Sequence, residues 1–102
     1  MRRGTTPFLT FGVPFDPATA KRLWITFSQG GREVFTVEEE NCTFKGHVIC
    51  VKLSQIQTLS LAANKTLEMQ IRVLFPGETE DYALASDIIT TSVSAILKEG
   101  VI

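Results

Sequence analysis

The two cysteines and the single histidine of the chain lie within the ten residues NCTFKGHVIC. Cys42, His47 and Cys50 could form a metal site, a disulfide or a catalytic thiol–imidazole pair. A structural zinc ion takes four ligands at characteristic spacings, and the chain has only these three soft ones. A catalytic cysteine also needs an activating environment and a group that orients its base. The residues predict neither a metal site nor a catalytic pair.

The turn of this hairpin decides whether the two thiols can meet. With a turn centred between Lys45 and Gly46, Cys42 lies on a nearly uniform apolar face and Cys50 on the opposite one. With a turn centred on Gly46, the cysteines face each other, but Lys52 joins their face. A one-residue slip exchanges the faces of a strand, so the apolar pattern should select the register. We predict two free thiols on opposite faces.

Other chemistry-bearing side chains are sparse. Carboxylates cluster at 38–40 and at 78–81, without the glycine-punctuated aspartate spacing of a calcium loop. No phosphate-binding glycine loop, nucleophile elbow or dinucleotide fingerprint is present. We therefore predict that the protein is not an enzyme and uses no cofactor or metal.

Composition indicates a globular chain of one domain, 1–102, with residues 1–6 and 98–102 expected as flexible ends. Of 102 residues, 44% are apolar and 21% charged, which is unlike a disordered protein. The net charge of −1 does not indicate the basic surface that nucleic-acid-binding proteins carry. No run approaches the ~20 apolar residues that span a bilayer, and the N-terminal stretch lacks a signal-peptide core. We expect synthesis in the cytoplasm and neither nucleic acid nor membrane as a partner.

Apolar residues alternate with polar ones along most of the chain, as in β-strands. The clearest strand is 66–75, and another apolar face follows 9–15. The last alternation places Ala83, Ala85, Ile89, Thr91 and Val93 on one face. It is interrupted at 86–87, where we expect a bulge or a change of pairing partner.

Two short segments predict single helical turns, with Asp16 and Ser54 as their N-caps. About seven strands without a long helix predict an antiparallel two-sheet β-sandwich, with another small β-barrel as the alternative.

The hairpin around Gly30 and Gly31 has a register that can be predicted. A symmetric two-residue turn would pair Ile25 with Thr36, whereas an odd loop centred on Gly30 pairs Ile25 with Phe35. The second register matches apolar with apolar side chains, and likewise Leu23 with Val37. We predict a three- or five-residue loop with a bulge.

Four apolar residues fall outside the predicted core faces and form the candidate interaction surface: Phe8, Trp24, Val101 and Ile102. For Trp24 the alternative is that a loop of its own chain covers it. The two terminal residues either dock on the domain or await another chain.

Several segments resemble short proteins of phages and prophages of Gram-positive bacteria, often gut Firmicutes. They are MRRGTTP, PFD, ITFSQ, VKLSQIQTLSL, MQIRVLFPG, LASDIITTSV and ILKEGVI, which together span almost the whole chain. The resemblance implies a virion structural protein encoded among tail or other structural genes. The architecture is also similar to the immunoglobulin-like N-terminal domains of siphophage upper baseplate proteins, which implies an immunoglobulin-like sandwich. The chain lacks the long helical and receptor-facing regions that follow those domains.

Three functions follow as hypotheses. The first is a phage tail or baseplate module that binds other phage structural proteins or self-associates into a ring. The second is a surface-binding module that recognises carbohydrate or protein, with an aromatic patch around Trp24 and Tyr82. The third, a small enzyme or anti-host effector, would need a pocket with perturbed ionisable groups.

Overall fold

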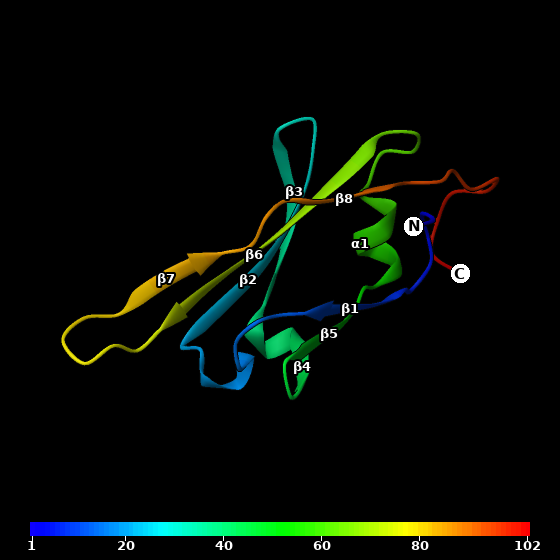
Figure 1. The fold of residues 1–102 in the computed structure, drawn as a ribbon. Helices are drawn as coiled ribbons and strands as arrows, with labels where there is room; N and C mark the ends of the chain where they lie inside the picture. The colour runs from blue at the N-terminus through cyan, green and yellow to red at the C-terminus, as the bar shows by residue number, and fades with distance from the viewer.

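The computed structural model describes residues 1–102 and contains two antiparallel β-sheets packed face to face (Figure 1). The strands are β1 (Phe8–Gly12), β2 (Arg22–Gln29), β3 (Arg32–Glu38), β4 (Cys42–Lys45), β5 (Val48–Lys52), β6 (Thr66–Phe75), β7 (Tyr82–Ala85) and β8 (Ile89–Ser92). One sheet has the order β1-β5-β4, and the other has β3-β2-β6-β7 with β8 also paired to β6. The predicted all-β sandwich is confirmed, with eight strands instead of about seven.

Three short helices connect the strands: η1 (Pro17–Thr19), η2 (Glu39–Asn41) and α1 (Gln55–Leu59). Both predicted caps are present. The Asp16 carboxylate accepts a hydrogen bond from the Ala18 N–H, and the Ser54 hydroxyl accepts one from the Gln57 N–H. The Gln57 side-chain oxygen accepts a hydrogen bond from the Ser54 N–H, which completes a capping box.

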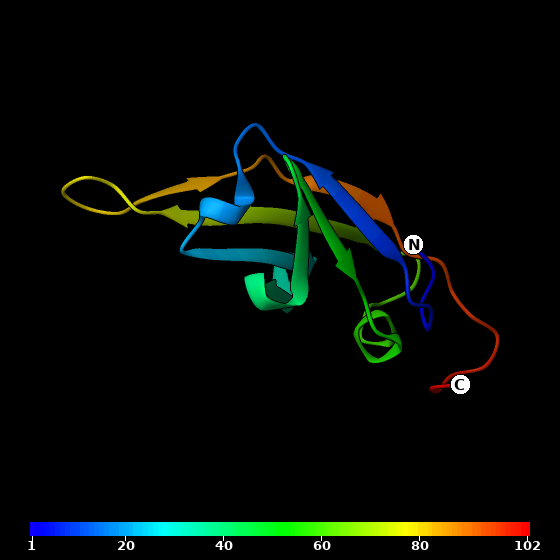
Figure 2. The ribbon, with the colours of Figure 1, turned by 90° about the horizontal axis from the view of Figure 1, so that it is seen from below.

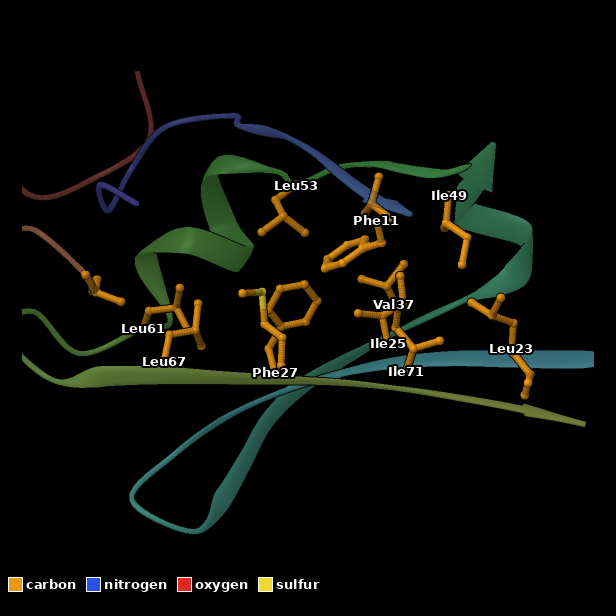
Figure 3. Packing of buried hydrophobic residues seen from close by; sticks show 14 of the residues in the cluster. Phe11, Leu23, Ile25, Phe27, Val37, Ile49, Leu53, Leu61, Leu67 and Ile71 are labelled. Carbon is orange, nitrogen blue, oxygen red and sulfur yellow. The ribbon is translucent and has the colours of Figure 1, made fainter. Parts of the chain in front are cut away.

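The core lies between the sheets, where the small sheet crosses one face of the large one (Figure 2). Figure 3 shows Phe11 and Ile49 of the small sheet, with Leu53 beside α1, above Ile25 and Phe27 of the large sheet. The β6 prediction is confirmed, because its alternate residues are all buried: Leu67, Met69, Ile71, Val73 and Phe75. The face predicted for 9–15 also packs on the core, with Phe11 buried and Leu9, Val13 and Phe15 half-buried.

The register predicted for the β2–β3 hairpin is wrong in its pairs. The turn is the two residues Gly30 and Gly31, with Gln29 opposite Arg32. A bulge then shifts the register, so that Phe27 pairs with Phe35 and Ile25 with Val37. The predicted bulge exists, and it brings apolar residues together by adding Val34 to one strand. The Phe27 and Phe35 rings stack with their centroids 4.6 Å apart.

The β4–β5 hairpin turns at Gly46 and His47, one residue beyond the expected centre. Cys42 pairs with Val51 and Thr43 with Cys50, so the cysteines lie on opposite faces. Both thiols are free, as predicted.

The last two strands, β7 and β8, pair with the same strand, β6, one after the other. The interruption is therefore a bulge without a change of partner: Arg72 pairs with Ala85, but Met69 pairs with Ile89. Ile89, Thr91 and Val93 keep the predicted inner face. Ala83 and Ala85 do not, because the register places them beside Leu74 and Arg72 on the outer face.

The molecule is elongated, with principal extents of 52 × 26 × 17 Å. The turn after β6 and strand β7 form an arm (residues 76–85) that projects from the sandwich (Figure 1). No helix is long and apolar enough to span a membrane.

Candidate functional site

The largest hollow of the molecule is an apolar groove between β1 of the small sheet and β7–β8 of the large one. Its volume is about 610 Å³, and 11 of its 15 lining residues are hydrophobic. The floor comes from Met69, Ile71 and Val73 on β6. Leu84 and Ile89 line it from the large sheet and are 47% and 40% exposed. A groove of this size and composition is typical of a binding site.

The groove exists because the small sheet ends at β1 and the large sheet ends at β7 and β8. On the other side of the sandwich, η2 leads directly from β3 into β4 and joins the two sheets. On the groove side, neither β1 nor β7 has a further strand beside it. Both edges are therefore free to pair with another strand.

The groove is closed at one end by the first residues of the chain. Arg2 forms an isolated parallel bridge with Ser94, just after β8. The Arg3 N–H donates to the Ser94 carbonyl at 3.1 Å, and the Ser94 N–H donates to the Met1 carbonyl at 2.7 Å. Away from this bridge no backbone pairing joins β1 to β7 or β8, and the groove lies there.

The four residues predicted as an interaction surface lie in three separate places. Phe8 lines the groove and is 70% exposed. Trp24 lies on the outer face of the large sheet, 40% exposed, with the Arg72 guanidinium 5.6 Å from its ring centroid. Val101 and Ile102 are exposed at the end of the tail, where the Ile102 N–H donates to the Gln55 side chain.

The aromatic patch that the second hypothesis requires is not formed. Trp24 pairs with Arg72 on the outer face, whereas Tyr82 pairs with Phe75 on the inner face of the same sheet. The outer face around Trp24 instead carries polar side chains and a depression of about 550 Å³. Its other lining residues are Thr26, Glu33, Thr36, Glu38, Asn41, Gln70 and Arg72.

The cysteines and the histidine do not assemble a reactive centre. Burial, with a further contribution from the charge of Glu39, raises the pKa of the Cys42 thiol to about 11. A thiol with that pKa is protonated at neutral pH and is a weak nucleophile. His47 sits in the exposed turn. No group of three histidine, cysteine, aspartate or glutamate side chains could hold a metal ion.

Sequence reasoning missed the part of the groove formed by β7. The alternation was assigned through Ala83 and Ala85, while Tyr82 and Leu84 share the inner face with Phe75 and Val73. The larger size of the two missed residues was the signal that could have placed them inside.

Comparison with known proteins adds no assignment: no family model, no curated protein and no solved structure matches the chain.

Proposed function

We propose that the protein is a non-enzymatic structural or assembly module that acts by protein–protein interaction. The observation that carries this proposal is the apolar groove between two free strand edges. Exposed Phe8, Leu84 and Ile89 surround it, and a soluble protein rarely leaves such a surface uncovered unless it binds something.

The setting of this interaction is the particle of a phage or prophage, in its tail or baseplate. The resemblance of almost the whole chain to short phage structural proteins supports this setting. Open sheet edges also suit a component that joins neighbouring subunits, including copies of itself in a ring. An immunoglobulin-like sandwich is the architecture that the same resemblance implies.

Mass spectrometry of purified virions from an induced lysogen that carries the gene tests this proposal. We expect the protein at a fixed copy number beside the tail proteins. An abundant protein in the lysate that is absent from the particles would contradict the structural role.

The second candidate is a surface-binding module that recognises carbohydrate. The observation that favours it is the outer-face depression, where an exposed tryptophan stands among amide, hydroxyl and carboxylate groups. A glycan array distinguishes the two candidates, with Trp24→Ala as the matched variant. Binding of a defined glycan that is lost in Trp24→Ala would support this candidate over the first.

A further inference from the structure

We propose that the groove binds one extended strand of a partner protein, which pairs with the free edges of β1 and β7 and carries uncharged apolar side chains at alternate positions. This inference rests on the proposed function and names the chemistry of the partner. It is carried by the backbone at the two edges and by the charges in and around the groove.

The backbone of β1 presents unpaired groups to the groove. In an antiparallel pair, successive residues direct their N–H and C=O alternately toward and away from the partner strand. The Val13 N–H bonds the His47 carbonyl, and the Leu53 N–H bonds the Pro7 carbonyl. The odd-numbered residues of β1 therefore face β5. The remaining residues direct their backbone groups to the free edge: Phe8, Thr10 and Gly12.

The opposite edge shows the same arrangement. The Ser86 N–H bonds the Ile71 carbonyl at 2.8 Å, which fixes the alternation along β7. Ala83 and Ala85 consequently direct their N–H and C=O away from β6. Each edge thus offers donors and acceptors that an incoming backbone can pair with, and an apolar small molecule cannot.

The two edges of the groove run in opposite directions. The chain leaves the Arg2–Ser94 bridge through a turn at Gly4, and beyond β1 the Phe15 ring packs on Phe75, which lies against Tyr82 at the start of β7. β1 therefore runs from the end of β8 toward the start of β7 (Figure 1). One strand between them is antiparallel to one edge and parallel to the other, and it would close the sandwich on its open side.

The side chains of the groove select an uncharged inner face on the partner. None of the 15 lining residues is ionisable, and a charge placed over this floor would lose its hydration. Two acidic residues, Asp16 and Asp87, directly follow the lining residues Phe15 and Ser86, and neither forms a salt bridge. This charge distribution favours apolar side chains at alternate positions and lysine or arginine at outward positions near Asp16 and Asp87.

The tail of a second copy is a poor occupant on the same criteria. Residues 96–102 read ILKEGVI, so one face of the extended tail carries Lys98 and the other Glu99. Either register would place a charge over the apolar floor. The strand is therefore expected from a different protein.

The proposal can be tested by selecting, from a yeast-displayed library of random nine-residue peptides, those that bind the whole protein. The lining segment of β1 and its flank runs from Phe8 to Phe15, so nine residues at about 3.3 Å each cover it. We expect enriched peptides with apolar residues at every second position and basic residues among the others. A synthetic copy of the best clone should bind at least tenfold more weakly to Leu84→Lys than to the wild type. Ile56→Lys, the same kind of change at an exposed residue of α1 outside the groove, should leave binding unchanged.

Hydrogen exchange and a backbone variant separate a paired strand from mere apolar contact. The amides of Thr10 and Ala85 should exchange rapidly in the free protein and at least tenfold more slowly in the complex. Thr10→Pro, which removes an outward N–H, should weaken binding at least tenfold, while Thr10→Ala retains it. If Thr10→Pro does not fold, a peptide N-methylated at alternate amides applies the same test from the other side.

Enriched peptides without period-two apolar residues, no enrichment at all, or binding without amide protection would each overturn the strand. If a lipid vesicle or a fatty acid, and no peptide, protected these amides from exchange, the groove would be assigned to a lipid. A protein found at fixed copy number in virions but binding no strand would retain its proposed function and lose this inference. If the protein binds such a strand but is absent from virions, this inference is retained and the proposed function is lost.

Discussion

Gln29 is the buried polar residue whose loss should most clearly weaken the fold. It ends β2 and is 9% exposed. Its amide nitrogen donates to the Ala62 carbonyl at 3.0 Å, and its amide oxygen accepts from the Ala62 N–H at 2.8 Å. This pair of bonds ties the β2–β3 hairpin to the loop after α1, 33 residues along the chain.

Gln29→Met keeps most of the side-chain volume and removes both hydrogen bonds. Each bond contributes on the order of 1 kcal/mol net. Ala62 is exposed, so water can reach its peptide groups and the penalty for leaving them unpaired stays small. We expect the free energy of unfolding to fall by about 2 kcal/mol. For a domain of this size that corresponds to a drop in Tm of about 10 °C.

Urea denaturation followed by the fluorescence of Trp24, the only tryptophan, measures this change. The midpoint should fall while the m-value stays constant, because the surface exposed on unfolding is unchanged. A loss below about 0.5 kcal/mol would refute the reasoning, since surface substitutions lie within that range.

Gln29→Glu adds a pH test of the same pair of bonds. A neutral carboxyl can donate to the Ala62 carbonyl, whereas a carboxylate repels it, so the folded-state pKa should rise above the unfolded value of about 4.3. The added stability is then complete below the unfolded pKa and lost as the pH rises through the folded pKa. A stability difference between the Glu and Met variants that does not change with pH would contradict the assigned hydrogen bonds.

Three further predictions concern the core, the bulge and the thiol. Leu67→Ala, at a fully buried site, should lose about 3 kcal/mol in urea denaturation, whereas Leu84→Ala in the groove should lose less than about 1; equal losses would contradict the open groove. Ser86→Ala removes the hydroxyl that accepts from the Ile71 N–H at 3.0 Å, so it should lose about 1 kcal/mol and speed exchange of that amide; an unchanged rate would argue against the bond. Cys42, with a pKa of about 11 against an ordinary 9.0, should have about 100-fold less thiolate at pH 8. A thiolate of higher pKa is more nucleophilic, which offsets part of this loss of thiolate. Iodoacetamide should therefore label Cys42 about tenfold more slowly in the folded protein than in urea, and equal labelling rates by mass spectrometry would contradict the burial of Cys42.

The parts of the fold that could be predicted from the sequence depend on local patterns. The strand 66–75 has one face buried and one exposed, so its alternation is unambiguous. The caps at Asp16 and Ser54 depend on side chains two or three residues from the groups they bond. Each of these features is decided within a few residues.

The registers were harder because single extra residues change them. Val34 adds one residue to β3, so the pairs near the turn obey a symmetric two-residue loop while the pairs beyond it do not. No single register describes both parts, and the predicted one, which pairs Ile25 with Phe35, describes neither.

The groove could not be predicted because it depends on how the two sheets are placed. Its walls come from Phe8 and Leu84, which are 76 positions apart and belong to different sheets. Alternation assigns a face to each residue within its own strand. It does not say where one sheet ends relative to the other.

The projecting arm has a consequence for how the molecule unfolds. The radius of gyration is 14.7 Å, against about 13 Å for a compact chain of this length. All four residues of β7 are exposed, so the arm is held mainly by its ladder with β6 and, at its base, by the contact of Tyr82 with Phe75. Segments of this kind open without the rest of the protein. The arm should therefore fray as a separate unit, well below the temperature at which the sandwich melts, and a single unfolding free energy would describe the sandwich alone.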